Sequence, residues 1–470
     1  MIGNSKLVGR RLFLAGGTLT LAAACTCVSQ KEYDALKAEL EAARSQTLVQ
    51  TGQLLPAAAG TKPTGWATTE SIRGGLQLLA AYDSSGPDAW SAKDHPVVYI
   101  TSEGASKLFS PGSNTVPGVM IIDAYTKAVV ASARFEGSDE AKTQHGHGVG
   151  ISPDGKWLHA GNMIINARTL RLDKVLSKPI HHSIGFKDWQ GRDRVTRTTN
   201  SGPNFILDPN DDNRVVMAIT GDNVPMMGHN YVTVDPTGKF LYQNMRPSSW
   251  GGAGQFGATA GVAKVNLETR ELTYIWGLGE NGNPIGTSHT ADGKYTYVND
   301  GHNSHVYKID NTTNQVVGET SAGVAGPYGN RLNWDETELW IVGKGEGSHN
   351  RGGVLAVIDT KTFRQFNTFN QPIALGGSAA SIDHAILHPD PAVNELWVSN
   401  MGGWETIVLD LNTKKVKGYI ATPHGGDTHS GGFVRYKADW TGELLTDMGG
   451  PQRPMYATMR DKAAAVVASR

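Results

Sequence analysis

Cysteine is almost absent from this 470-residue sequence, with Cys25 and Cys27 as the only two. Because both lie near the N-terminus, the rest of the chain has no disulfide and no thiolate metal ligand. Any metal site in the main body must therefore use histidine, carboxylate, methionine, tyrosine or backbone donors. The sequence also lacks an excess of either charge, since it contains 43 Lys and Arg residues and 44 Asp and Glu residues. No basic face is implied, and we expect no nucleic-acid partner.

Long hydrophobic runs and common nucleotide-binding motifs are also missing. The apolar run from Leu12 to Ala24 is too short to cross a bilayer permanently. No glycine-rich nucleotide loop precedes a helix, and no Gly-x-Ser-x-Gly elbow occurs. From about residue 75 onward we expect no helix of ordinary length. Glycine, in contrast, is 57 of the 470 residues, well above the usual share of about 7%, which indicates turn-rich β structure.

The N-terminus predicts an export signal followed by a spacer. The segment RRLFL at 10–14 resembles a twin-arginine signal, the route that carries folded proteins, so residues 1–24 are assigned to a signal peptide and the protein to the periplasm. The sequence leaves open whether Cys25 is lipidated and anchors the chain to a membrane. Residues 25–70 are predicted to be a short helical spacer and linker, which leaves 71–470 for the main domain.

One unit recurs through the main domain: an apolar strand, a turn rich in Asp and Gly, a second strand, and two further short strands. The turns with their second strands are SPDGKWLHAGN from Ser152, DPTGKFLYQN from Asp235, ADGKYTYVND from Ala291, NWDETELWIVG from Asn333, HPDPAVNELWVSN from His388 and KADWTGELLTD from Lys437. Four short antiparallel strands, repeated about every 47 residues, are typical of a β-propeller. We predict an all-β, seven-bladed β-propeller. The strands near 97–135 either complete the blade that begins at His429 or form an eighth.

Histidines recur where the first strand of each unit begins. The equivalent positions are His147, His182, His229, His289, Tyr328, His384 and His429. A lone histidine at a strand end is usually solvated or hydrogen-bonded, but six of seven such positions are histidine in a chain with only 15. First strands line the central channel of a propeller, so their starting residues converge at one mouth. Imidazoles gathered there without sulfur suit copper or zinc.

The segments around these histidines resemble the copper β-propeller family of thiocyanate dehydrogenase and the nitrous oxide reductase catalytic domain. The resemblance covers roughly residues 95–435. It is carried by QHGHGVGISPDGK with His145 and His147, PIHHSIGF with His182, MGHNYVTVDPTGKFLY with His229, GTSHTADGKYTYVND with His289 and SIDHAILHPD with His384. The resemblance implies several copper ions held by these histidines, and the repeat spacing adds His429.

Two departures favour thiocyanate dehydrogenase within that family. Tyr328 stands where a further histidine is expected, and the paired cysteines of the reductase's second copper domain have no counterpart. The resemblance then implies a catalytic lysine ahead of the first histidines, for which Lys107 is the candidate, and an acidic residue, for which Glu103 is a candidate. It also implies a small anionic substrate and a periplasmic electron acceptor such as a cytochrome c.

Two other functions remain open at this stage. A non-catalytic repeat propeller, exported and lipid-anchored, would use its faces to bind a ligand or a protein, because folds do not determine function. A copper storage or delivery protein would share the histidine ring without needing a catalytic base. The ring of histidines favours a metalloprotein over the non-catalytic binding propeller. A binding scaffold does not require imidazoles at equivalent positions around the channel mouth.

Overall fold

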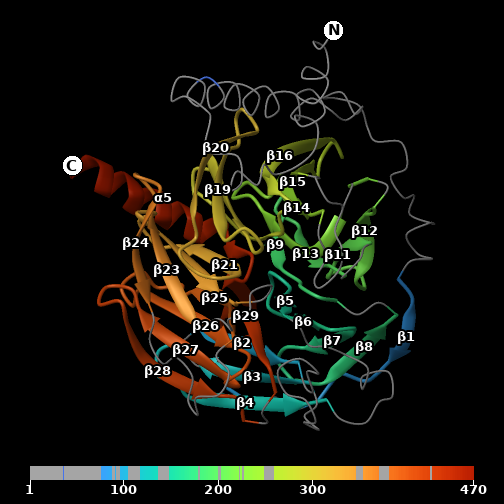
Figure 1. Cartoon of the computed structure of the whole chain (residues 1–470). Helices are drawn as coiled ribbons and strands as arrows, with labels where there is room; N and C mark the ends of the chain where they lie inside the picture. The colour runs from blue at the N-terminus through green and yellow to red at the C-terminus, as the bar shows by residue number, and fades with distance from the viewer. Residues whose placement is uncertain are drawn as a thin grey trace.

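Seven sheets arranged around a common centre form a seven-bladed β-propeller, which confirms the predicted fold class (Figure 1). The structure is a computed structural model. It describes Ala35 and residues 76–86, 90–91, 96–103, 117–135, 148–177, 180–199, 203–221, 223–224, 227–247, 259–345, 353–369, 381–423 and 426–469, with the backbone alone for 227–231 and 366–369. The predicted signal peptide, Cys25 and almost all of the spacer lie outside these residues. No helix in the described part is long and apolar enough to span a bilayer.

Six blades are each made of consecutive strands, and the first strand of each lies next to the channel. The first blade contains β5 (Val149–Ile151), β6 (Trp157–Ala160), β7 (Met163–Asn166) and β8 (Leu172–Leu176), with β1 (Leu78–Ala81) at its outer edge. The second contains β9 (Gly185–Lys187), β10 (Asp193–Arg197), β11 (Asn204–Asp208) and β12 (Arg214–Ile219). The third contains β13 (Met227–Val234), β14 (Phe240–Met245), β15 (Thr259–Asn266) and β16 (Leu272–Glu280).

The next three blades repeat this order around the ring. The fourth contains β17 (Pro284–His289), β18 (Tyr295–Asp300), β19 (His305–Asp310) and β20 (Gln315–Ser321). The fifth contains β21 (Pro327–Leu332), β22 (Glu338–Gly343), β23 (Val354–Asp359) and β24 (Arg364–Phe369). The sixth contains β25 (Ile382–Leu387), β26 (Glu395–Asn400), β27 (Glu405–Asp410) and β28 (Lys415–Ala421).

The turn between the first two strands of a blade explains the repeated Asp and Gly. In the first blade, Ser152 Oγ donates to Asp154 Oδ1 at 2.6 Å, and the backbone N–H of Lys156 also reaches that carboxylate at 3.1 Å. Gly155 has φ +71°, a left-handed conformation that glycine adopts without steric cost. The short polar turn therefore determines where one strand ends and the next begins.

The seventh blade joins the two ends of the described chain. Strand β29 (Thr428–Tyr436) pairs antiparallel with β2 (Val97–Ser102), which is followed outward by β3 (Gly118–Asp123) and β4 (Val129–Arg134). The N-terminal strands thus complete the blade that begins at His429, and they do not form an eighth. This closure ties an N-terminal and a C-terminal segment of the propeller together within one sheet.

Strand β30 (Gly442–Asp447) corrects one expectation. We expected it to be an outward second strand, but it lies on the opposite side of β29 from β2, followed by β31 (Gly450–Pro451). There Thr446 Oγ1 donates to the carbonyl of Leu387 at 2.7 Å, and the Leu444 N–H donates to the carbonyl of Pro153 at 2.9 Å. These partners belong to the inner parts of two different blades, so β30 fills the channel. The alternation of polar and apolar residues in β30 is the same as in the second strands of the other blades. The sequence therefore did not show that β30 lies inside the channel.

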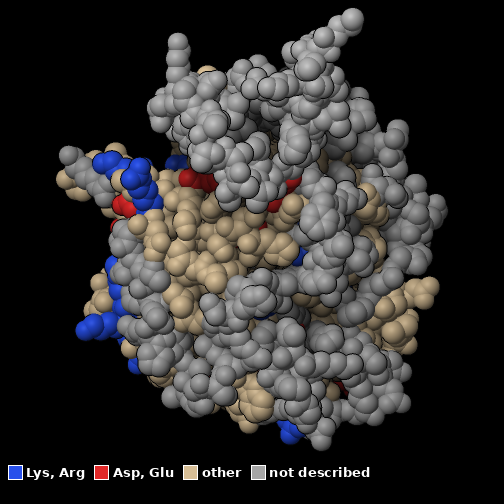
Figure 2. All heavy atoms as spheres, viewed as in Figure 1, with Lys and Arg blue, Asp and Glu red and all other residues tan. Residues whose placement is uncertain are grey.

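The helix α5 (Arg453–Ala468) is a second correction, since no helix of ordinary length was expected in this region. Its first turn contains a proline, which has no N–H to lose there. Only Tyr456 and Met459 are buried on it, so its apolar stripe is narrow and easily missed. Beyond that contact α5 projects from the body (Figure 1). On the face shown in Figure 2, the coloured residues are mostly uncharged, and basic side chains gather where α5 projects.

Candidate metal centre

Three of the expected histidines reach one mouth of the channel. His384 is the third residue of β25, His429 is the second residue of β29, and His182 lies just before β9. All three side chains are buried, with exposed fractions of 2% or less. The convergence that the repeat spacing predicted is therefore present for these three residues.

The centre of the cluster combines two of these histidines with a carboxylate. One possible metal-binding atom each from Asp383, His384 and His429 lies within 4.8 Å of the other two. Asp383 Oδ2 lies 3.1 Å from His429 Nδ1 and 3.7 Å from His384 Nε2. Imidazole nitrogen and carboxylate oxygen are both common ligands of divalent transition metals.

Asp383 is a site residue that the sequence reasoning missed. Successive residues of a regular strand point to opposite faces, so Asp383 and His384 were not expected to share one. However, the register of β25 against β26 shifts between Ile382 and Ala385. A shift of this kind turns a strand locally and re-aims its side chains. Only an irregularity visible in the backbone could have identified Asp383.

His182 extends the cluster toward the second blade. Its Nε2 lies 3.0 Å from His384 Nε2, and the two rings are nearly perpendicular, at 82°. The hydroxyl of Tyr328 lies 3.4 Å from the same nitrogen of His182. Tyr328 therefore occupies the ring position that its spacing predicted and contacts an imidazole there.

Lys344 is a second residue that the sequence reasoning missed. It follows β22 directly, its exposed fraction is 3%, and its Nζ lies 3.5 Å from Asp383 Oδ2. The same ammonium lies 4.0 Å from the centre of the Tyr328 ring, within cation–π range. Its place after the second strand of the fifth blade, close to the mouth, is the only signal that could have pointed to it.

Glu103 lies beside the cluster on its other side. Its Oε1 is 3.1 Å from His429 Nε2, and its backbone N–H donates to the carbonyl of Asp427 at 2.9 Å. His429 thus has a carboxylate facing each ring nitrogen, Asp383 at one and Glu103 at the other. The structure brings the expected acidic candidate Glu103 to the site, and its catalytic role stays a prediction.

Burial and charge set the protonation of this cluster. Burial lowers the pKa of His384 to about 3, despite the neighbouring Asp383, so its imidazole is neutral at pH 7. Burial alone would raise the pKa of Asp383, but the basic side chains around it outweigh this and hold its pKa well below the usual value. A neutral imidazole and an ionised carboxylate are the forms that bind a metal.

His289 is not brought to the cluster, and its expected position is corrected. It is the last residue of β17, at the turn end of the channel strand, whereas His384 and His429 lie near the starts of theirs. Its ring nitrogens lie 2.8 Å from Thr233 Oγ1 and 2.9 Å from Thr296 Oγ1. The shorter run between His289 and its turn explains the difference, and we leave this residue out of the proposed site.

Four other expected residues are not placed by the structure. His145, His147 and Lys107 lie outside the described residues. His229 lies within β13, but its side chain is outside the described part. Their roles as ligands or as the catalytic lysine stay predictions from the sequence.

Copper fits the donors that are present. The described cluster offers imidazole nitrogens and a carboxylate oxygen, all buried, and the sequence supplies no cysteine to the propeller. This donor set without thiolate suits Cu(II) or Zn(II), and Cu(II) binds such sites most tightly among the divalent first-row metals.

Comparison with known proteins identifies no family. No family model matches the chain, and no curated protein matches it. A functionally unknown protein from Desulfotomaculum acetoxidans is similar in structure, with 11% identity over 70% of this chain and 98% of its own and a TM-score of 0.47. The dihydro-heme d1 dehydrogenase NirN is 15% identical over 90% of this chain and 92% of its own, with a TM-score of 0.43.

A third similar structure is a protein assigned as a 6-phosphogluconolactonase from Bacteroides uniformis. It is 11% identical over 73% of this chain and 100% of its own, with a TM-score of 0.49. At these identities and scores we draw no functional argument from any of the three. Evidence on function therefore comes from the residues of this chain.

Proposed function

We propose that this protein is a periplasmic copper-dependent oxidoreductase that acts on a small inorganic anion, in the manner of thiocyanate dehydrogenase. The observation that carries the proposal is the convergence of Asp383, His384 and His429 at the channel mouth. Two neighbouring blades contribute these ligands, so they come together only through the fold. His182 from a third blade lies within 3.0 Å of His384.

The residues around the ligands have separate roles in this proposal. Asp383, His384 and His429 hold the metal, and His182 contacts His384 from a third blade. Lys344 places a buried ammonium beside the metal site, where it attracts an anion into the channel mouth. Glu103 contacts His429 Nε2 and positions that ring, as a carboxylate behind a metal-ligating histidine usually does.

Copper supplies electrophilic activation of the anion and accepts its electrons when bound. The electrons pass to an external acceptor, for which a periplasmic cytochrome c is the candidate. Water is the source of any oxygen added to the substrate, and Glu103 is the described carboxylate within reach of the cluster that can hold the released proton. Lys107, outside the described residues, is the other candidate for this base.

Copper stoichiometry tests the proposal first. The mature chain is loaded with Cu(II), freed of loose metal, and assayed for copper per chain beside the double variant His384→Ala, His429→Ala. A matched control, His289→Gln, changes a buried histidine that the structure keeps away from the cluster. We expect bound copper in the parent and the control, and at least a tenfold loss of affinity in the double variant.

Turnover distinguishes the remaining outcomes. The loaded parent is mixed with thiocyanate and an oxidised cytochrome c, and reduction of the cytochrome is followed by absorbance. Reduction that depends on both copper and thiocyanate supports the proposal. Bound copper without turnover of thiocyanate or related anions would favour copper storage, and absence of copper would leave a binding propeller.

A further inference from the structure

Exposed apolar side chains of the described chain concentrate on β1, the added outer strand of the first blade. Leu78 and Leu79 are 55% and 52% exposed, and Tyr82, just beyond the strand, is 40% exposed. They are three of the eight large hydrophobic side chains that are exposed among the described residues. Figure 1 shows β1 at the right-hand rim of the ring. Apolar side chains gathered in this way mark a surface that another element covers.

β1 also presents an open backbone edge beside these side chains. Its sheet has the order β1-β8-β7-β6-β5, so β8 is its one neighbour among the described strands. The inner side of β1 is occupied, since Leu78 pairs with Leu176 and the N–H of Tyr82 donates to the carbonyl of Asp173 at 2.8 Å. The outer side of an edge strand carries a row of backbone donors and acceptors, so β1 can accept a further strand.

β1 lacks the charge that protects the other outer strands. The other six blades have β4, β12, β16, β20, β24 and β28 at their outer edges, and each of these strands contains a charged residue. These residues are Arg134, Arg214, Glu280, Glu319, Arg364, Lys415 and Lys417. The sequence of β1 is LLAA, without a charge. Because charges on an edge strand oppose pairing with another chain, β1 is the one unprotected outer strand in the described part.

An apolar groove adjoins β1 on the side of the second blade. Its volume is about 330 Å³, and Leu78, Leu176 and Val215 are among the residues that line it. A strand added to β1 would bring its own side chains against this apolar surface. It would therefore gain apolar contacts as well as backbone hydrogen bonds, the combination that strand addition to a sheet edge requires.

We infer that β1 pairs antiparallel with β1 of a second copy of this chain, so that two first blades form one continuous sheet across a twofold axis. In such a self-pairing, a charge near the centre of the strand would meet the same charge of the copy. An uncharged strand meets no such repulsion, whereas a different protein would be selected through opposite charges. The formal net charge of −1 leaves little repulsion between whole molecules. This pairing is independent of the proposed metal centre at the channel mouth.

The oligomeric state of the mature chain tests the pairing. Sedimentation velocity over a range of protein concentrations gives the mass of each species and the dissociation constant of a dimer. Leu79→Lys places a charge at an exposed position of β1, so we expect a dimer in the parent and at least a tenfold larger dissociation constant in the variant. Val317→Lys is the matched control, because Val317 is 53% exposed on β20, an outer strand that already contains Glu319. It should dimerise as the parent does.

Hydrogen exchange locates the interface by a separate readout. The backbone amides of residues 78–82 should exchange more slowly as the concentration of the parent rises, because β1 then becomes an inner strand. This protection should be absent in Leu79→Lys. The amides of β20 should exchange at the same rate at every concentration.

Three results would overturn the pairing. A parent that is monomeric at every concentration excludes the second copy as the occupant, which leaves an extended segment of another protein for β1. A dimer that Leu79→Lys leaves intact places the interface elsewhere. Equal weakening by Leu79→Lys and Val317→Lys would make added charge the cause, and not its place on β1. Thermal unfolding followed by circular dichroism confirms that each variant is folded before it is scored.

Discussion

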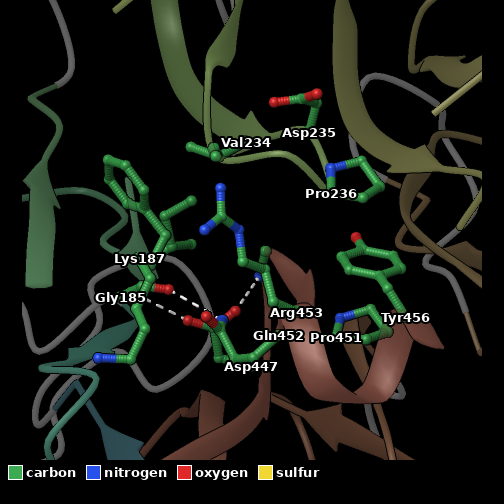
Figure 3. A pocket seen from close by; sticks show the side chains of 14 residues that line it. Gly185, Lys187, Val234, Asp235, Pro236, Asp447, Pro451, Gln452, Arg453 and Tyr456 are labelled. Atoms are coloured by element: carbon green, nitrogen blue, oxygen red, sulfur yellow. Dashed lines mark hydrogen bonds between the residues drawn. The ribbon is translucent and has the colours of Figure 1, made fainter. Parts of the chain in front are cut away.

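The two mouths of the channel place buried aspartates in opposite electrostatic surroundings. Asp383, at the histidine mouth, is surrounded by basic side chains that hold its pKa well below the usual value despite burial. Asp447, at the end of β30, is equally buried, and burial raises its pKa to about 7. Backbone N–H groups of Gly185 and Gly449 donate to Asp447 at 3.0 Å and 2.8 Å. Figure 3 shows Asp447 with Gly185 and Gln452 around a small pocket.

The difference shows that burial alone does not determine the state of a carboxylate. Arg331 lies near Asp447, but its Nε donates to the carbonyl of Ala385 at 3.0 Å and its Nη2 donates to the carbonyl of Met448. The described hydrogen bonds of its guanidinium therefore go to backbone carbonyls and not to the carboxylate of Asp447. At the other mouth, Lys344 and His429 are aimed at Asp383 directly. Asp383 is held as an anion, the form that binds a cation. Asp447 instead connects β30 to the backbone of Gly185 and Gly449 through hydrogen bonds.

The largest expected effect comes from neutralising Asp383. In metal-free protein at pH 7, Asp383→Asn should lower the free energy of unfolding by about 3–5 kcal/mol, because it breaks the buried ion pair with the Lys344 ammonium. Asp447→Asn should instead raise the free energy of unfolding at pH 7 by about 2 kcal/mol, since the amide avoids the cost of ionising this buried carboxyl and gives up only one hydrogen bond from a backbone N–H. Urea unfolding followed by fluorescence measures both.

Asp439→Asn, in an exposed turn, is the control for the substitution itself and should change stability by less than about 0.5 kcal/mol. Equal losses for Asp383→Asn and Asp447→Asn would contradict the proposed difference between the two mouths.

The pH dependence of stability should be the next largest effect. The folded protein keeps a proton on Asp447 up to about pH 7, whereas the unfolded chain releases it near the ordinary value of 3.8. This contribution is fully present below about pH 4 and is lost as pH rises toward 7, by about 4 kcal/mol at most. Asp447→Asn should remove this part of the slope. Urea titrations at pH 5, 6, 7 and 8 measure it, and an unchanged slope in the variant would count against the raised pKa.

The smallest expected effect concerns the hydrogen bond that joins Gln452, just before α5, to Gly185 of β9. Gln452 Nε2 donates to the carbonyl of Gly185 at 3.0 Å, beside the N–H of Gly185 that binds Asp447 (Figure 3). Gln452→Ala should lower the free energy of unfolding by about 1 kcal/mol. Gln315→Ala, on the exposed edge of β20, should leave it unchanged. A loss in Gln452→Ala no larger than in this control would show that β30 and α5 are held by their apolar contacts alone.

The sequence predicted the repeating parts of this molecule better than the unique ones. The Asp-Gly turns and the alternating strands predicted seven blades, because each blade repeats the same local chemistry. β30 and α5 occur once, and nothing repeats to reveal where they pack. The site follows the same rule. His182, His384 and His429 were found through their spacing. Asp383 and Lys344 were missed, because one depends on an irregularity of β25 and the other lies in the loop after β22.

The seventh blade, shared between both ends of the chain, also has a consequence for biogenesis. Tyr99 of β2 and Tyr436 of β29 are 337 residues apart in sequence, yet their hydroxyls lie 2.9 Å from each other. Synthesis proceeds from the N-terminus at about 5–20 residues per second, so β2 waits many seconds for its partner. Ring closure therefore waits until β29 has been synthesised. Because Glu103 and His429 come from the two parts of that blade, the proposed metal site can form only after β2 and β29 have both been synthesised and have paired.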